Sequence, residues 1–254
     1  MKQPDYEQYA RFYDFFELAG HEESEEINLF LNELFKLNGV ETVLDFAAGT
    51  GAQSIGLARL GYKVTATDKS RAMIELAKEK ATRHPGLKID FQVGDMVTAN
   101  PGVFDAAICI FNAIGHLSSD ECVRFFKNAF KNIKVKGLFV VDIFNLTAML
   151  AGSFEEYNYL SRELVIDGEV INHVRNCELD EQRRLIKISS MTRLQDGSHD
   201  LKTITDDWEM KIYDCDEMRC MLETAGFSEI VFFGPTGSEF DPQKSDSILA
   251  VCQK

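Results

Sequence analysis

The sequence predicts an α/β protein built on a doubly wound, mostly parallel seven-stranded sheet, with an antiparallel β ribbon inserted late in the chain. Three observations predict this fold. Strand-like apolar runs alternate with helical periodicity from residue 42 to residue 144. A glycine-rich turn follows the first of these runs, and hairpin signals replace the alternation after Phe154. Such alternation is typical of right-handed crossovers, which place helices on both faces of a parallel sheet.

The composition indicates a globular protein that acts on small molecules. Of its 254 residues, 45% are hydrophobic, which is enough for one large core. It carries 41 acidic and 27 basic residues, and its net charge of -14 would repel nucleic acid and anionic membranes. We therefore expect a small-molecule acceptor as the partner, with no nucleic acid and no membrane. The sequence leaves the oligomeric state open.

The cysteines and the apolar runs bear on the cellular location. The six cysteines are scattered, with no C-x-x-C pair and no histidine at metal-ligand spacing, so we expect reduced thiols and no metal site. No run approaches the roughly 20 apolar residues of a membrane span, and the first residues lack the apolar core of a signal peptide. These features predict a cytoplasmic protein.

Two helices are predicted before the sheet, within residues 1–37. An aromatic helix spans residues 6–16, and the segment 22–37 places apolar residues at helical spacing: Ile27, Phe30, Leu31, Leu34 and Phe35. The sheet then uses apolar runs at 42–46, 63–68, 88–95, 105–111 and 137–144, with helices at 51–60, 70–82 and 119–132. A last helix at 214–225 stops at Gly226, and the runs 229–234 and 247–252 pair as the final two strands.

Residues 154–212 are predicted to form the inserted antiparallel β subdomain, which would cover the active site of a single domain over residues 1–254. Two turn dipeptides support this prediction. Asp167-Gly168 separates the runs LVI and EVI, and Asp196-Gly197 follows MTRL and precedes a longer alternating run.

The stretch Val43–Gly51, VLDFAAGTG, is a buried strand that runs into a glycine turn at the start of a helix. It does not match a dinucleotide site, since the fingerprint G-x-G-x-x-G has a glycine where this chain has Ser54. Asp45 would repel a pyrophosphate and would suit a ligand with a sulfonium or ammonium cation. Ala47 replaces the first glycine, and a turn residue with negative φ accepts its methyl group. A branched side chain at Gly51 is expected to fill space that the ligand needs.

Acidic residues also follow the next two strands. Asp68 closes the second strand, where an acid commonly accepts from both hydroxyls of a ribose. Asp95 follows the third strand, and its carboxylate can accept from an adenine amino group while the backbone beside Met96 meets the ring edge. Singly, Asp45 could cap the loop, Asp68 the next helix and Asp95 a turn. Jointly, at three successive strand ends, they indicate adenine, ribose and a cationic amino acid, which together form S-adenosylmethionine.

The motifs VLDFAAGTG, VTATDKS, VGDM and ICIFNAIGHL resemble the ordered motifs of class I S-adenosylmethionine-dependent methyltransferases. With the spacing Asn112-x-x-x-His116 and the run VDIFN at 141–145, the sequence is similar to glycine N-methyltransferase and to amino-sugar N-methyltransferases. The resemblance implies a Rossmann-like methyltransferase fold and S-adenosylmethionine as the cofactor. It implies donor contacts from the four motifs and the N-terminal helix: Tyr13, Asp45, Ala47, Gly49, Gly51, Asp68, Lys69, Asp95, Met96, Ile110 and Asn112.

His116 is the first candidate for orienting or deprotonating the acceptor, because FNAIGHL follows the fourth strand and would lie at the carboxyl edge of the sheet. Its structural alternative is a cap for the helix near Ser119. With an ordinary pKa of about 6.5, His116 would make the rate fall below that pH. Tyr13 resembles the tyrosine that closes over the methyl donor in this group, and its alternative is core packing beside Phe12.

The ribbon offers four further candidates for substrate contacts: His173, Arg175, Arg193 and Trp208. Strand alternation places Trp208 on one face with Ile204 and Met210, which favours packing over recognition for its indole. A charged residue on a ribbon is usually solvated, although an arginine could bind a carboxylate or phosphate of the acceptor.

We therefore expect an enzyme that uses S-adenosylmethionine to methylate a small molecule, on an amine nitrogen. Methylation of a hydroxyl oxygen is the alternative within this fold, because the fold does not determine the acceptor atom. Two other classes stay open. The chain could be a non-catalytic module that binds S-adenosylmethionine, or an NAD-dependent oxidoreductase.

Overall fold

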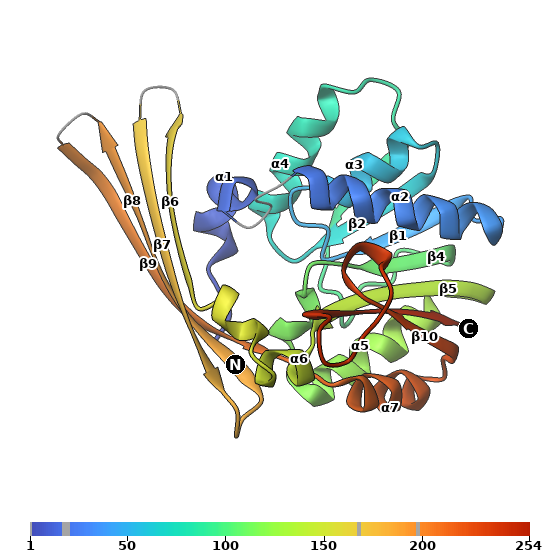
Figure 1. The fold of residues 1–254 in the computed structure, drawn as a ribbon. Helices are drawn as coiled ribbons and strands as arrows, with labels where there is room; N and C mark the ends of the chain where they lie inside the picture. The colour runs from blue at the N-terminus through green and yellow to red at the C-terminus, as the bar shows by residue number, and fades with distance from the viewer. Residues whose placement is uncertain (1, 17–20, 167–168, 197–198) are drawn as a thin grey trace.

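A computed structural model describes residues 2–16, 21–166, 169–196 and 199–254, and it contains two sheets (Figure 1). The larger sheet has seven strands in the order β10-β11-β5-β4-β1-β2-β3. Its strands are β1 (Thr42–Phe46), β2 (Lys63–Asp68), β3 (Ile89–Val93), β4 (Phe104–Cys109), β5 (Ile133–Phe144), β10 (Ser228–Phe233) and β11 (Ser247–Gln253). Strands β1 to β5 pair in parallel, and β11 is antiparallel to both β5 and β10. The predicted fold class is confirmed.

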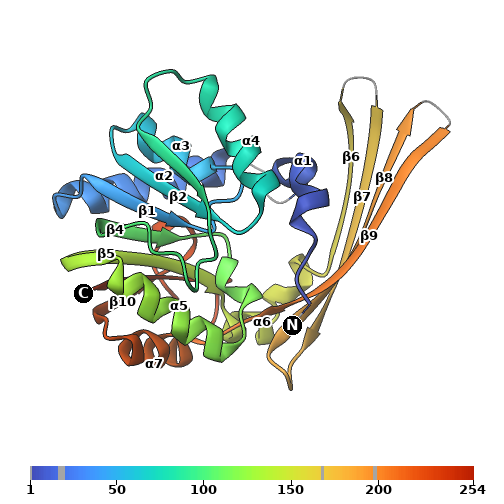
Figure 2. The same ribbon diagram turned by 180° about the vertical axis from the view of Figure 1, so that it is seen from behind.

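Helices cover both faces of this sheet because its strands are apolar on both sides. In β1, Val43 packs into a core with the helices α2 (His21–Leu37) and α3 (Ala52–Arg59). The next residue, Leu44, points to the opposite face, where α5 (Ser119–Lys131) and α7 (Cys215–Ala225) pack. Helix α4 (Arg71–Thr82) packs near α3 through a smaller apolar cluster (Figure 2).

The second sheet is a four-stranded antiparallel ribbon in the order β6-β7-β8-β9. Its strands are β6 (Tyr159–Ile166), β7 (Glu169–Asp180), β8 (Leu185–Asp196) and β9 (His199–Lys211), and α6 (Leu146–Leu150) precedes it. The predicted turn residues Asp167, Gly168 and Gly197 lie outside the described residues. One ribbon face carries an apolar cluster that includes Ile188 and Trp208 and contacts α6 through Leu146.

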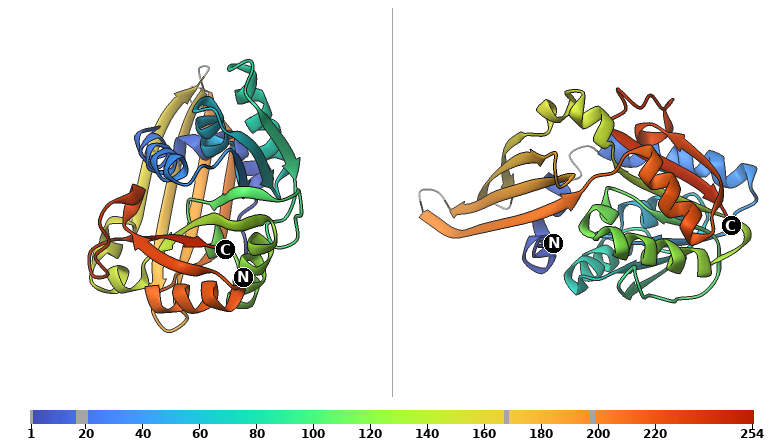
Figure 3. Two further views of the ribbon diagram at one scale, coloured as in Figure 1. Left: turned by 90° about the vertical axis from the view of Figure 1, so that its right-hand side faces the viewer. Right: turned by 90° about the horizontal axis from the view of Figure 1, so that it is seen from below.

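Helix α1 (Tyr6–Phe16) lies between the ribbon and the seven-stranded sheet (Figures 1 and 3). Phe12 packs against Ile171 and Leu194 of the ribbon, so α1 is attached to it by apolar contact. None of the helices in the described ranges is both long and apolar enough to cross a membrane.

The turn after β1 adopts left-handed backbone conformations at three positions. Ala47 has φ of 54°, Gly49 has 52° and Gly51 has 84°. The explanation that Ala47 is tolerated because its φ is negative is therefore wrong. A methyl-bearing residue in the left-handed region carries strain, which the surrounding contacts must offset.

Gly51 serves packing rather than ligand access. A Cβ atom at this position would lie 3.0 Å from Ala77 Cβ and 3.4 Å from Phe91 Cε1, inside the cluster between α3 and α4. The expectation that a side chain here would occupy ligand space is therefore corrected, because the space belongs to the protein core.

We expect Gly51→Val to lower the free energy of unfolding by at least about 1–3 kcal/mol, since it overpacks the core at a positive φ. Urea denaturation followed by circular dichroism measures this loss. Gly39→Val is the matched control, because Gly39 also has a positive φ (65°) and a Cβ there would meet no atom within 4 Å. Equal losses in the two variants would assign the effect to backbone strain alone.

Candidate active site

Two cavities adjoin at the carboxyl edge of the seven-stranded sheet. The first has a volume of about 310 Å³ and lies over the ends of β1, β2 and β3. The second, of about 390 Å³, lies between the sheet edge and the ribbon. Residues that line both cavities come from the α1 region and from the segment after β4: Pro4, Tyr6, Tyr13, Ile110, Phe111 and His116. Ligands bound in the two cavities would therefore meet at these side chains.

Asp68 lines the first cavity and connects the glycine turn to the start of α4 by hydrogen bonds. Its Oδ2 accepts from the backbone N–H of Gly49 at 2.8 Å, and its Oδ1 accepts from the N–H of Ser70 at 2.8 Å. Burial raises the pKa of this carboxyl group. Each carboxylate oxygen can accept a further hydrogen bond, so both remain available to hydroxyl groups of a ligand.

Most of the predicted donor contacts line the first cavity together: Tyr13, Ala47, Gly49, Asp68, Lys69, Asp95, Met96 and Ile110. Asn112 instead lines the second cavity. Asp45 and Gly51 are in neither lining. Asp45 is buried and accepts a hydrogen bond from the Ser54 hydroxyl of α3, and burial raises its pKa to about 7.

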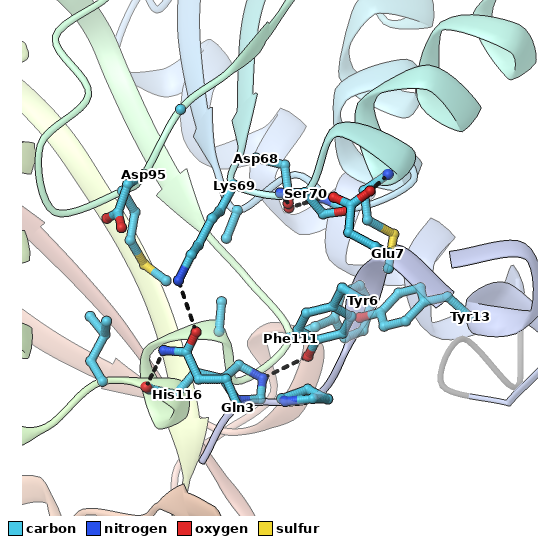
Figure 4. Close-up of a pocket in the computed structure, with 18 of the residues that line it drawn as sticks. Gln3, Tyr6, Glu7, Tyr13, Asp68, Lys69, Ser70, Asp95, Phe111 and His116 are labelled. Atoms are coloured by element: carbon cyan, nitrogen blue, oxygen red, sulfur yellow. Dashed lines mark hydrogen bonds between the residues drawn. The ribbon is translucent and has the colours of Figure 1, made fainter. Parts of the chain in front are cut away.

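The segment before α1 and the first turn of α1 contribute cavity residues that the sequence patterns did not indicate (Figure 4). Gln3 accepts from Lys69 Nζ at 3.1 Å and donates to the His116 carbonyl oxygen at 3.0 Å. Glu7 accepts from the N–H of Arg71 at 2.8 Å, at the start of α4. These bonds join residues more than 60 positions apart, so no local sequence pattern reports them.

His116 ends a short 3-10 helix, η1 (Ala113–His116), at the junction of the cavities. Its Nε2 lies 2.7 Å from the Tyr6 hydroxyl, and within the described residues its buried Nδ1 has no hydrogen-bond partner. Burial, with a smaller effect from the Lys69 charge, lowers the pKa of His116 to about 4. The imidazole is therefore neutral at neutral pH. The cap of α5 is Ser118, which accepts from the Glu121 N–H, so His116 does not cap that helix.

Tyr13 stands between the cavities from the side of α1. Its ring meets the Tyr6 ring edge-on at a centroid distance of 6.1 Å. A Cβ atom on Gly49 would lie 3.9 Å from Tyr13 Cε1, so the glycine turn and Tyr13 approach each other closely. Its neighbour Phe12 is buried against the ribbon, whereas Tyr13 is half-buried and lines both cavities.

The second cavity has one wall from the ribbon and one from the sheet. The ribbon wall includes two of the four predicted candidates, Arg175 and Trp208. His173 is buried, with its Nδ1 2.9 Å from the Thr192 hydroxyl, and Arg193 lines neither cavity. The sheet wall consists of residues from the ends of β5 and β11 and the loop before β11: Asp142, Phe144, Asp246, Ser247 and Leu249.

Asp142 holds a strained turn at this junction. Phe111 and Asn112 follow β4 with φ of 66° and 56°, which is uncommon for residues with side chains. The Asn112 N–H donates to Asp142 Oδ1 at 2.8 Å, and the Phe111 backbone also bonds to this carboxylate. Burial raises the pKa of Asp142 to about 6.

The lining of the first cavity offers acceptors for a nucleoside. Asp68 has acceptor capacity left for ribose hydroxyls, and Asp95 lies on the far side of Lys69 from it in Figure 4. A side chain on Gly49 would narrow the space toward Tyr13. Among the residues that the structure describes in this lining, Lys69 is the one cation, so the cavity does not favour a pyrophosphate.

Comparison with known proteins agrees with this fit. Residues 43–137 match the family model described as Methyltransferase domain. Human glycine N-methyltransferase is 32% identical over 142 residues, covering 50% of this chain and 48% of that protein. The chain spans about half the length of the curated relatives it matches.

Solved structures extend the likeness in fold to the whole chain. An S-adenosylmethionine-dependent methyltransferase from Clostridium acetobutylicum superposes with a TM-score of 0.78 at 18% identity, covering 98% of this chain and 99% of the other. The sugar N-methyltransferase KedS8 from a Streptoalloteichus species gives 0.77 at 16% identity, covering 100% and 94%.

The matched domain contains the glycine turn, Asp68 and Asp95. Strands β10 and β11 lie after the matched residues but belong to the same sheet. Residues 43–137 therefore belong to the methyltransferase domain family, and the whole chain has the fold of the methyltransferases whose structures it resembles.

Proposed function

We propose that this protein transfers a methyl group from S-adenosylmethionine to an amine nitrogen of a small-molecule acceptor. The observation that carries the proposal is the shared boundary of the two cavities. A donor in the first cavity and an acceptor in the second would meet beside Tyr6, Tyr13 and His116. Methyl transfer needs this contact between two bound molecules, whereas a binding module needs only the first cavity.

Nitrogen is the acceptor atom that the comparisons and the site support. Human glycine N-methyltransferase and the sugar N-methyltransferase KedS8 both carry names that state N-methylation. A neutral amine has a lone pair ready for attack, whereas a hydroxyl group reacts well only after a base removes its proton. His116, with a pKa of about 4, is a weak base for that purpose.

The protein's contribution to the reaction would be orientation. When bound, S-adenosylmethionine supplies an electrophilic methyl group on a sulfonium sulfur. Asp68, Asp95 and the backbone beside Met96 would hold the nucleoside, and Ile110 would form the floor near the reacting atoms. Orientation of two reactants in this way can lower a barrier by about 7–11 kcal/mol. No covalent intermediate with the protein is required.

His116 and Tyr13 would act on the acceptor side of the boundary. The Tyr6 hydroxyl fixes the His116 ring, so the imidazole presents a constant edge to an incoming amine. Tyr13 would close over the methyl group from α1. Residues 154–212 would act as the subdomain that covers the active site, and together with α1 they would exclude water from it.

A labelled-methyl assay tests the proposal. The protein is incubated with S-adenosylmethionine carrying a labelled methyl group and a panel of matched amines and alcohols, and products are identified by mass spectrometry. We expect labelled N-methyl products with S-adenosylhomocysteine released in equal amount. The Asp68→Ala variant gives the background.

Other outcomes assign the chain to a different class. Label on oxygen alone would make it an O-methyltransferase. Binding of S-adenosylhomocysteine without transfer across the whole panel would indicate a binding module. A rise in melting temperature with NAD and none with S-adenosylhomocysteine would indicate an oxidoreductase.

A further inference from the structure

The second cavity is acidic. Its charged lining residues are three acids and one base: Glu26, Asp142, Asp246 and Arg175. Asp246 also accepts a hydrogen bond from the Tyr157 hydroxyl, which orients its carboxylate. With all three acids ionised, the lining carries two more negative than positive charges. A cationic ligand is favoured in such a cavity, and a ligand with its own carboxylate is disfavoured.

The walls of the same cavity are largely apolar. Strands β8 and β9 contribute four buried hydrophobic side chains, and β5 and β11 contribute two more: Ile186, Ile188, Trp208, Met210, Phe144 and Leu249. Apolar walls with a few placed polar groups are typical of sites for small organic molecules. The body of the ligand should therefore be apolar or aromatic rather than densely hydroxylated.

Two of the hydrogen-bonding groups of the second cavity that lie next to the first are acceptors. Asp142 presents a carboxylate in the lining of the second cavity and is bonded to the backbone of Phe111 and Asn112, next to the shared boundary. The Asn112 side-chain oxygen is buried and, in the part of the chain that the structure describes, has no hydrogen-bond partner. A buried acceptor without a partner is costly, and an N–H donor from a ligand would satisfy it.

We infer that the second cavity takes an amine in its ammonium form on a largely apolar body, and that Asp142 with the Asn112 side-chain oxygen binds the nitrogen. This inference rests on the proposed function, which assigns the second cavity to the methyl acceptor, and it narrows the chemical class of that acceptor. An amino acid such as glycine would bring a carboxylate into the acidic cavity and is therefore disfavoured as a ligand.

The position of Asp142 also suits the reaction. The bound ammonium releases one proton to water before its lone pair attacks, and positive charge develops on the nitrogen again as the new N–C bond forms and the bond from that carbon to the donor's sulfur breaks. A fixed carboxylate beside the nitrogen stabilises both charges in a site shielded from water. The hydrogen bond from the Asn112 N–H fixes the Asp142 carboxylate beside the turn at Phe111 and Asn112. Phe111 in this turn lines both cavities, so the carboxylate lies next to their boundary.

The test compares two probes that differ only in their terminal group, which is charged in one and neutral in the other. Tryptamine carries an ammonium group at pH 7.5, and indole-3-ethanol has a neutral hydroxyl in its place. Their dissociation constants are measured by calorimetry with protein saturated with S-adenosylhomocysteine. We expect the wild-type protein to bind tryptamine at least tenfold more tightly, as for a charge-assisted hydrogen bond of about 1.5 kcal/mol.

Asp142→Asn is the decisive variant. The amide oxygen can still accept from the Asn112 N–H, so the turn should persist. In this variant we expect the dissociation constants of the two probes to differ by no more than about threefold. The affinity for indole-3-ethanol should stay within about threefold of the wild-type value. Asp105→Asn is the control, because Asp105 lies at the other end of β4 and bonds Lys134 and Thr42.

Each other result overturns the inference. If Asp142→Asn lost affinity equally for both probes, the role of Asp142 would be structural. If wild-type protein bound both probes with equal affinity, the inference that the ligand is a cation would be wrong. If neither probe bound, or if glycine bound more tightly than tryptamine, the inference that the ligand is an amine with an apolar body would be wrong. Because no methyl is transferred in this assay, its failure is distinct from failure of the proposed function, which the labelled-methyl assay reports.

Discussion

Replacing Asp68 with alanine is expected to weaken binding of S-adenosylhomocysteine by about tenfold to a hundredfold. Hydrogen bonds to a charged carboxylate contribute about 1.5–3 kcal/mol, and each 1.4 kcal/mol changes affinity about tenfold. The loss has a second cause, because Asp68 also accepts from the N–H groups of Gly49 and Ser70. Without these bonds the glycine turn loses its connection to the end of β2.

Calorimetry with S-adenosylhomocysteine measures this effect. Asp68→Asn separates the two causes, because the amide oxygen can still accept from one N–H group while the charge is gone. Asp90→Ala is the matched control, since Asp90 is an exposed acid on the neighbouring strand β3 and lines neither cavity. An unchanged affinity in a folded Asp68→Ala protein would place the donor elsewhere.

Replacing His116 with alanine is expected to lower turnover at least about tenfold while donor affinity stays within a few-fold of wild type. The donor would be held by the acids and the glycine turn, whereas His116 stands where the two cavities meet. Tyr6→Phe keeps the aromatic ring and removes only the hydroxyl that bonds Nε2, so we expect an intermediate loss. Saturating steady-state kinetics with a single acceptor measures both variants.

Equal turnover in His116→Ala and wild type would make His116 structural and would transfer its role to Tyr13 or to positioning alone. The pH profile adds a check on the environment of the imidazole. From the sequence, a loss of rate is expected below about pH 6.5. Because burial lowers the pKa of His116 to about 4, this ring stays neutral well below pH 6.5. A loss of rate between pH 6 and 8 would then reflect the acceptor or another group.

The same pKa shift predicts a change in stability. Between pH 6.5 and about 4 the unfolded chain binds a proton at His116 that the folded protein excludes. The free energy of unfolding should therefore decrease as the pH falls through this window. The decrease should be smaller in His116→Ala, which denaturation at pH 7 and pH 5 measures, and an equal decrease would show that His116 is solvated in the folded protein.

The sequence by itself determined the order of the elements and the donor edge of the sheet. Strand and helix periods, the glycine turn and an acid at the end of β2 are local patterns, and the parallel topology brings successive strand ends to one edge. For this reason Asp68, Asp95 and Gly49 were placed together from the sequence, and the structure has them in one cavity. The acid at the end of β1 shows the limit, since Asp45 is also at a strand end but bonds Ser54 inside the fold.

Only the tertiary structure decided the contacts across the cavity. Tyr6 and His116 are separated by 110 positions, and Gln3 and Lys69 by 66, so their bonds depend on where α1 settles between sheet and ribbon. The acidic second cavity likewise combines the ends of β5 and β11 with the ribbon. The ionisation of His116 also depends on the tertiary structure, because its pKa is determined by burial and by neighbouring charges. The sequence shows that a histidine is present at this position, but it does not show whether the imidazole is charged.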